Sequence, residues 1–124
     1  MLFRSANTTG SYNTAIGRQA LGSNTTASNN TAVGYQAGYS NTTGTENVFI
    51  GKSAGYANTT GSYSVHVGVG AGVSCTSGQN TLVGYAAGGS LTSGNFNTIV
   101  GPSTPTSAAG YAITTGSKNT ILGG

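Results

Sequence analysis

The stretch Asn30–Glu46, NTAVGYQAGYSNTTGTE, is the unit from which the chain is built, because variants of it recur along nearly the whole sequence. Each copy contains a β-prone tetrapeptide followed by a glycine. The tetrapeptides are NTAI from residue 13, NTAV from 30, NVFI from 47, SVHV from 64, NTLV from 80, NTIV from 97 and NTIL from 119. The glycines are Gly17, Gly34, Gly51, Gly68, Gly84, Gly101 and Gly123, which gives spacings of 17, 17, 17, 16, 17 and 22 residues. Such a period is typical of solenoids, in which each unit buries its apolar face against its neighbours. The sequence therefore predicts an all-β fold, a β-solenoid (β-roll or β-helix) of about seven 17-residue coils.

The repeat defines the domain organisation. Residues 6–124 are predicted to form a single β-solenoid domain, whereas residues 1–5 do not fit the repeat and resemble the translated end of a sequencing adapter, which indicates an artefact of sequence assembly. The sixth unit contains an insertion at 102–108, which includes Pro102 and Pro105. We expect a surface loop there, with two roles left open: recognition of a ligand, or length variation that the coil tolerates.

The alternation of side chains along a strand assigns each tetrapeptide two faces. We expect the second and fourth residues to face the inner core. The fourth column is Ile16, Val33, Ile50, Val67, Val83, Val100 and Leu122, and the second is Thr14, Thr31, Val48, Val65, Thr81, Thr98 and Thr120. A column of small residues predicts a narrow interior: Ala20, Ala37, Ala54, Ala71, Ala87 and Ala109.

The first residue of each tetrapeptide predicts a hydrogen-bonded amide ladder. Stacked Asn side chains bond to their neighbours above and below in repetitive β-sheets. The column consists of Asn13, Asn30, Asn47, Ser64, Asn80, Asn97 and Asn119. The ladder is expected to be structural.

The third residue of each tetrapeptide predicts a contact between chains. This column contains Ala15, Ala32, Phe49, His66, Leu82, Ile99 and Ile121, and on the expected outer face its apolar members form a strip that soluble monomers rarely expose. The simplest cover is the same strip of sister chains, so we predict a parallel homotrimer with Phe49, His66, Leu82, Ile99 and Ile121 as the trimer-contact strip. The competing interpretation is that this column lies inside a wider coil.

The composition argues against catalysis and against nucleic-acid binding. Charged residues make up 4% of the chain, with one acidic residue (Glu46), one histidine (His66) and one cysteine (Cys75), each in a different column. We therefore expect no enzyme, no catalytic or metal site and no cofactor. The cations Arg4, Arg18, Lys52 and Lys118 are scattered, whereas nucleic-acid binding needs a clustered basic face. No apolar run is long enough for a membrane-spanning helix. Cys75 is interpreted as drift at a turn position rather than as a reactive thiol.

The repeated phrases also resemble known families. NTAIG, NTAVG and NTIVG, each followed by alanine and glycine, resemble the left-handed β-roll head repeats of trimeric autotransporter adhesins. The longer phrases NTAVGYQAG and NTTGSYNTAIG resemble repeats of phage and viral tail fibres. The resemblance covers residues 7–124. It implies a trimeric fibre segment on a cell or virion surface, outside the cell, that binds a host surface, matrix or glycan.

Exposed aromatic rings suggest one recognition surface. Tyrosines stack on sugar rings, but they also serve as packing at solenoid corners. The candidates for surface recognition are Tyr35, Tyr39, Tyr56, Tyr85, Pro102 and Pro105. Asn-x-Thr glycosylation sequons begin at Asn7, Asn24, Asn29, Asn41 and Asn58.

The alternative function is ice binding, because flat β-solenoids can order water through threonine ranks. The rank in question is Thr8, Thr25, Thr42, Thr59, Thr76, Thr92 and Thr114. Adjacent threonines in an extended chain point to opposite faces, so the TT pair supplies only one outward rank. The sequence therefore favours a fibre segment over an ice-binding protein.

Overall fold

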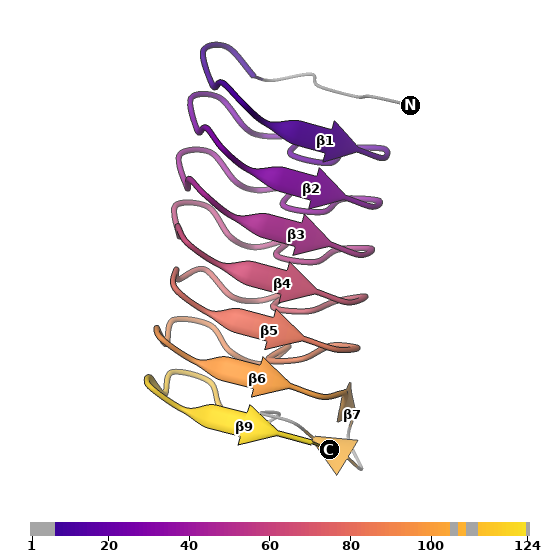
Figure 1. Cartoon of the computed structure of the whole chain (residues 1–124), viewed down its shortest axis with the longest axis vertical. Coiled ribbons are helices and arrows are strands. Elements are labelled where there is room, and N and C mark those ends of the chain that lie inside the picture. The colour runs from indigo at the N-terminus through magenta and orange to yellow at the C-terminus, as the bar shows by residue number, and fades with distance from the viewer. Residues whose placement is uncertain (1–6, 105–106, 109–111, 124) are drawn as a thin grey trace.

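The chain forms a β-solenoid in which seven repeats each contribute one strand to a single parallel sheet (Figure 1). The computed structural model describes residues 7–104, 107–108 and 112–123. The sheet follows the order β1 (Thr14–Ile16), β2 (Thr31–Val33), β3 (Val48–Ile50), β4 (Val65–Val67), β5 (Thr81–Val83), β6 (Thr98–Val100) and β9 (Thr120–Leu122). Equivalent residues pair across every junction, as Ala32 does with Phe49. The all-β solenoid predicted from the repeat is confirmed.

Each strand is short because the glycine after it turns the chain in a conformation that other residues disfavour. Gly34, which follows β2, has φ +131°, and a Cβ added there would lie 2.7 Å from the carbonyl carbon and oxygen of Gly51. Its amide donates a hydrogen bond to the carbonyl of Ile16 at 2.7 Å. The stacked coils therefore approach too closely at this corner for any side chain, which explains the regular glycine spacing.

The faces of the strands are the reverse of those predicted. The third column lies inside the solenoid: Ala15, Ala32, Phe49, His66, Leu82 and Ile99 are all 0% exposed within one chain, and Ile121 packs partly buried against the same core. The second and fourth columns form the outer face. The expected trimer-contact strip is therefore wrong for Phe49, His66, Leu82 and Ile99, because side chains without exposed surface cannot reach a sister chain. The competing interpretation, in which this column lies inside a wider coil, is confirmed.

The amide column explains which face turns inward. Asn30 and Ala32 lie two residues apart on the same face of β2, and both are 0% exposed. The Asn30 side chain donates to the carbonyl of Gly44 at 2.9 Å, and its Oδ1 accepts from the Asn47 amide at 2.9 Å. Both bonds lie inside the coil, so they hold the first and third residues of each tetrapeptide in the interior.

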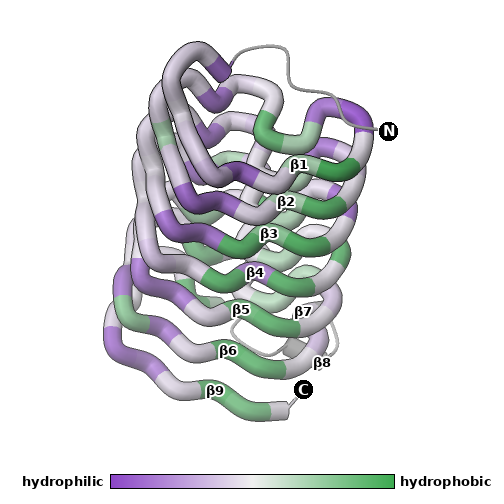
Figure 2. Tube along the Cα trace, turned by 45° about the horizontal axis from the view of Figure 1, so that its top comes forward, coloured by the Kyte–Doolittle hydropathy of each residue, from purple (hydrophilic) through white to green (hydrophobic). Residues whose placement is uncertain are grey.

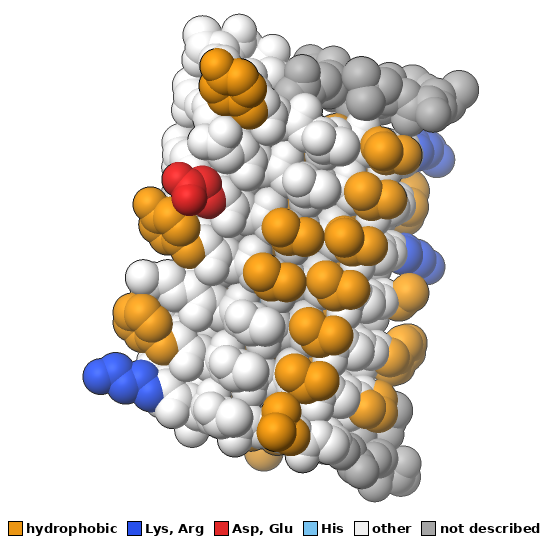
Figure 3. Space-filling view, viewed as in Figure 1, with side chains coloured by type: hydrophobic (Ala, Val, Ile, Leu, Met, Phe, Trp, Pro, Cys, Tyr) orange, Lys and Arg blue, Asp and Glu red, His pale blue; other side chains and the backbone are white. Residues whose placement is uncertain are grey.

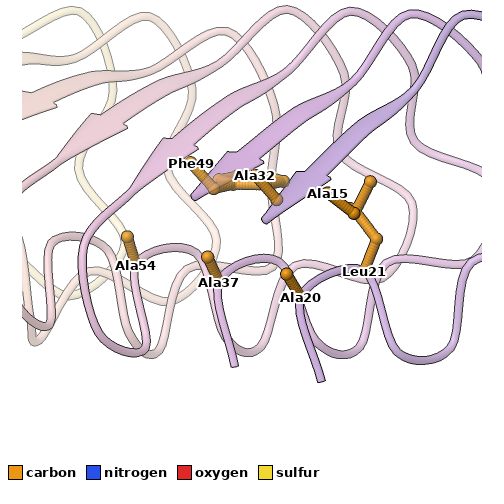
Figure 4. Close-up of a cluster of buried hydrophobic side chains, with 7 residues drawn as sticks. All are labelled: Ala15, Ala20, Leu21, Ala32, Ala37, Phe49 and Ala54. Atoms are coloured by element: carbon orange, nitrogen blue, oxygen red, sulfur yellow. The ribbon is translucent and has the colours of Figure 1, made fainter. Parts of the chain in front are cut away.

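The core is filled by complementary sizes on its two walls (Figure 4). The predicted narrow wall is confirmed, since Ala20, Ala37, Ala54, Ala71 and Ala87 are all fully buried; Ala109 lies outside the described residues. Where the strands carry the small Ala15 and Ala32, Leu21 belongs to the same core cluster. Phe49 on β3 lies beside Gly38, and Gly38 occupies the position of Leu21 in the next coil. Large and small residues thus alternate between the walls.

The predicted insertion begins as a regular part of the coil. Ser103 donates its amide to the Tyr85 carbonyl at 2.8 Å, as the equivalent Ser53 does to Tyr35 at 2.9 Å. The chain then forms a small antiparallel pair, β7 (Ser103–Thr104) with β8 (Ser107–Ala108). Pro102 is exposed, whereas Pro105 lies outside the described residues. The insertion is therefore attached at the end of the main sheet.

Candidate interaction surface

The outer face of the main sheet is an uncovered array of aliphatic and threonine side chains. The fourth column is partly to largely exposed, with Ile16 at 48%, Ile50 at 39%, Val100 at 38% and Leu122 at 72%. The second column beside it contains only Thr and Val. Figure 3 shows the aliphatic side chains running down the middle of this face, and Figure 2 shows the apolar segments stacked along the strands. We call these two columns the sheet face: Thr14, Ile16, Thr31, Val33, Val48, Ile50, Val65, Val67, Thr81, Val83, Thr98, Val100, Thr120 and Leu122.

The sheet face contains no charged residue along its whole length. Arg18 and Lys52 lie beyond the glycines that end β1 and β3, and both are exposed. Thr14, Thr31, Thr81, Thr98 and Thr120 bring hydroxyl groups to the same surface. The surface therefore combines aliphatic area with evenly spaced hydroxyls on a rigid backbone.

The threonine rank proposed for ice binding takes part in the stacking of the coils. The hydroxyl of Thr42 donates to the Thr59 carbonyl at 3.0 Å, and that of Thr92 donates to the Thr114 carbonyl at 2.9 Å. Thr8, Thr25 and Thr76 make the equivalent bond to the next coil. Because their hydroxyl groups donate hydrogen bonds to backbone carbonyls of the next coil, these threonines are primarily structural.

The four candidate tyrosines do not form one site. Tyr35 and Tyr85 are exposed, at 39% and 60%, and lie in one column just beyond the strands. The Arg18 guanidinium lies 6.0 Å from the centre of the Tyr35 ring. Tyr39 and Tyr56 are instead half-buried and stacked, with ring centres 5.4 Å apart and planes 9° apart. Tyr39 and Tyr56 therefore act as packing at a corner of the solenoid.

A more exposed aromatic column was missed in the sequence. Tyr12, Tyr63 and Phe96 are 87%, 59% and 53% exposed, and each has a positive φ near 60°. Each immediately precedes a residue of the amide column, as do Asn29, Glu46, Gln79 and Lys118. That constant position, filled by large residues in an otherwise small-residue repeat, is the signal that could have identified an outward-facing column.

Two buried amide columns line the interior beside the turns. The predicted ladder of side-chain bonds is confirmed in part, from Asn97 to Asn80 at 3.1 Å and from Asn119 to Asn97 at 2.9 Å. In the earlier coils the backbone amide bonds to the side chain of the coil before, as the Asn47 N–H does to Asn30 Oδ1 at 2.9 Å. Most of the side-chain N–H groups, however, donate to turn carbonyls. The other amide column, at the turns, contains Asn24, Asn41 and Asn58, which are also buried. Three of the predicted sequons therefore begin at buried side chains, whereas Asn29 is exposed.

The residues with catalytic potential, Glu46, His66 and Cys75, make no contact with one another in the described structure. Glu46 is exposed, whereas His66 and Cys75 are fully buried. Burial raises the pKa of the Cys75 thiol, and its sulfur contacts the hydroxyl of Ser77 at 3.4 Å and the Asn80 amide at 3.6 Å. Among the described residues there is no pocket and no group of three or more potential metal ligands.

A helix able to cross a membrane is not found in the described part of the chain. In comparison with known proteins, no family model, curated protein or solved structure matches this sequence.

Proposed function

We propose that the chain is a structural and adhesive segment of an extracellular fibre, a trimeric adhesin head or a tail fibre, which mediates attachment to a surface. The observation that supports this proposal is the uncovered sheet face. Its fourth column forms a continuous apolar strip along seven strands, and soluble monomers rarely leave such a strip in contact with water. The resemblance of the repeats to adhesin heads and tail fibres supports the same function.

The sheet face is the surface through which sister chains associate. Burying aliphatic area releases about 25 cal/mol per Å², and the face contains no charge whose desolvation would oppose contact. Because all seven strands are parallel and in register, a second and third copy present the same ladder of side chains at the same spacing. A parallel homotrimer around a shared axis covers all three faces. The contact columns are the second and fourth, in place of the third column predicted from the sequence.

Attachment to a target uses the surfaces that remain free in such an assembly. These are the corner with Tyr35 and Tyr85, the aromatic column of Tyr12, Tyr63 and Phe96, and the exposed Pro102. Exposed aromatic rings favour a glycan or another surface with apolar patches as the target class.

The association is tested by the molar mass of the purified chain in multi-angle light scattering. The proposal expects three times the 12.1 kDa of one chain over a range of concentrations. A mass of 12.1 kDa at every concentration would contradict it.

Ice binding is the second candidate, and one observation favours it. On the sheet face, the second and fourth columns both point outward, so the strands supply two regular outward ranks where the TT turns supply one. Along each rank the repeat is the strand spacing of roughly 4.8 Å. This candidate needs the sheet face to be free, so it requires a monomer that shows thermal hysteresis. A solution without hysteresis or ice shaping excludes it.

A further inference from the structure

The interior of the solenoid is divided into two apolar clusters. One contains Ala15, Leu21, Phe49 and the small residues packed with them, and it lies under β1 to β3. The other contains Cys75, Leu82, Leu91 and Ile99 and lies under β5 and β6. His66 on β4 lies between them. Its ring centre is 5.4 Å from that of Phe49, and it pairs in register with Leu82.

In the described part of the chain, His66 has no hydrogen-bond partner. Both ring nitrogens, Nδ1 and Nε2, are buried, and neither makes a hydrogen bond within the described residues. Gly72 closes the opposite side, where an added Cβ would lie 2.6 Å from Nδ1. A buried donor or acceptor without a partner is destabilising, and a buried charge without a partner is more so.

Among the described residues, no charged group is packed against His66 to compensate a charge on its ring. The residues packed against it from the neighbouring strands and the opposite wall are Phe49, Leu82 and Gly72, and none is titratable. Each charged side chain of the described residues, namely Arg18, Glu46, Lys52 and Lys118, is exposed. The buried Cys75 contacts Ser77 and Asn80. Burial accordingly lowers the pKa of His66 from 6.5 to about 4.

The junction between β4 and β5 is also the place where the regular stacking at the turns is interrupted. At the other junctions, the first Thr of each turn bonds to the next coil through its amide, as Thr42 does to Thr59 at 2.9 Å. Between Thr59 and Thr76, neither the amide bond nor the hydroxyl bond is present in the described structure. The spacing from Gly68 to Gly84 is one residue shorter than at the neighbouring junctions. Thr76 in the short turn therefore does not align with Thr59 in the turn before it.

Both amide columns also change at this junction. Ser64 replaces Asn in the first column, and its hydroxyl accepts the Asn80 amide at 3.3 Å, whereas Asn47 Oδ1 accepts the Ser64 amide at 2.9 Å. In the amide column at the turns, Cys75 follows Asn58 and ends the run of asparagines. Strand bonds remain, such as that from the Val65 amide to the Asn80 carbonyl at 2.8 Å. The junction thus keeps its strand bonds, the turn bond from the Gln79 amide to the Ser62 carbonyl at 2.8 Å and the bond from the Gly72 amide to the Ala87 carbonyl at 2.9 Å, but among the described residues it lacks the threonine bonds found at the other junctions.

We propose that the β4/β5 junction is an acid-sensitive break point, at which proton uptake by His66 separates the coils while the two flanking clusters keep their structure. In a solenoid each coil contacts only its neighbours, so one junction can open without global unfolding. The closed junction cannot solvate an imidazolium, whereas the open junction exposes it to water. The proton therefore binds to the open state and holds it open.

The direction of the pH effect follows from the depressed pKa. The open state binds the proton below about pH 6.5, whereas the closed state binds it only below about pH 4. Closure is therefore most favourable above pH 6.5 and weakens as the pH falls toward 4. Linkage between these two values gives an open-to-closed ratio that rises about 100-fold from pH 7 to pH 4.

Cys75 provides a natural reporter of the opening, because its thiol is fully buried beside the junction. We would measure its labelling rate with 4,4′-dithiodipyridine from pH 7 to pH 4 and divide it by the rate of glutathione at each pH. The expected normalised rate rises about 100-fold over this range. In the His66→Leu variant, whose new side chain matches Leu82 in the same column, the rate should not change with pH. A flat profile in the native protein, or the same rise in the variant, would overturn the proposal.

Two further measurements decide the outcome without the variant. His66 is the chain's one histidine, so its imidazole proton resonances can be followed directly by NMR. A titration near pH 6.5 in the folded protein would contradict the proposal.

Hydrogen exchange at pH 4.5, corrected for intrinsic rates, separates local opening of the junction from global unfolding. Amides at the junction, such as that of Val65, should lose protection while that of Thr31 in β2 keeps it. Equal loss at both positions would show global unfolding and would also contradict the proposal.

Discussion

The ring of Phe49 occupies the space beside Gly38, where an added Cβ would lie 2.5 Å from Phe49 Cδ2. At the equivalent position one coil earlier, Leu21 fills the interior opposite Ala15 and Ala32. The same backbone position therefore holds a leucine or a glycine according to the size of the strand residue that faces it. This exchange of volume keeps the solenoid cross-section constant while the strand residues vary.

Replacing Gly38 with alanine is expected to destabilise the fold through overpacking. Gly70→Ala is the matched control, because its φ of +69° resembles the +58° of Gly38 while an added Cβ meets nothing closer than 3.9 Å. Both variants lose stability from the left-handed backbone, but Gly38→Ala should lose about 1–3 kcal/mol more. Urea denaturation measures the difference. Adding Phe49→Leu should recover part of the loss, and equal stabilities for the two alanine variants would contradict the packing described.

Shortening Leu21 should leave a cavity in the first core cluster. The Leu21→Ala variant is expected to lose about 2–4 kcal/mol of unfolding free energy, because the Leu21 side chain is buried next to alanines that cannot expand to fill the space. Val69→Ala, at a side chain that is 48% exposed, should lose less than about 0.5 kcal/mol. Thermal denaturation of the two variants tests this, and a loss at Leu21 no larger than that at Val69 would contradict the assignment.

Removing one asparagine from the inner ladder should be more destabilising than its size indicates. Asn47 accepts the Ser64 amide at 2.9 Å and donates to the Gly61 carbonyl at 2.8 Å, and it is fully buried. Asn47→Ala leaves the Ser64 amide without its acceptor, so we expect a loss of about 1–3 kcal/mol. Thr43→Ala, at an exposed turn residue, serves as the control. Chemical denaturation of both variants gives the comparison, and similar midpoints would contradict a structural role for the ladder.

Replacing His66 with leucine should stabilise the protein even at neutral pH. At pH 7.5 the imidazole is uncharged in the folded and unfolded states, so only its unpaired buried nitrogens matter. Removing them in favour of an apolar side chain of similar length is expected to add about 1–3 kcal/mol. Thermal denaturation at this pH measures the change. A less stable His66→Leu variant would indicate that the nitrogens have partners in solution.

The sequence predicted the period, the strands and the small-residue wall, but not which face of each strand is buried. The period, the strands and the small-residue wall could be predicted from periodicity alone. Glycine and alanine recur because only small residues fit where neighbouring coils or walls approach closely, as at Gly34 and Ala37. The prediction of the buried face was wrong because both faces of each strand carry apolar residues. Val33 and Ile50 lie on one face, and Phe49 and Leu82 lie on the other. Hydrophobicity alone cannot distinguish a core from an uncovered surface in that case.

Two features of the sequence could have resolved the ambiguity. The third column shares its face with Asn30 and Asn47, whose hydrogen bonds are strong only away from water. Its residues also range in size from Ala32 to Phe49, and the facing column compensates with Leu21 and Gly38. A surface strip needs no such compensation. The exposed column of Tyr12 and Phe96 was missed because it follows from turn geometry, which the periodicity of the strands does not describe.

The central claim is that the sheet face is the surface through which chains associate. The most direct test compares the molar masses of two glutamate variants by sedimentation velocity. Ile50→Glu places a charge in the middle of the sheet face, where Ile50 is 39% exposed; Val69→Glu places it outside that face, at a side chain that is 48% exposed. The claim predicts a trimer for the unmodified chain and for Val69→Glu, and a folded 12.1 kDa monomer for Ile50→Glu. Trimers in all three proteins, or monomers in all three, would contradict it.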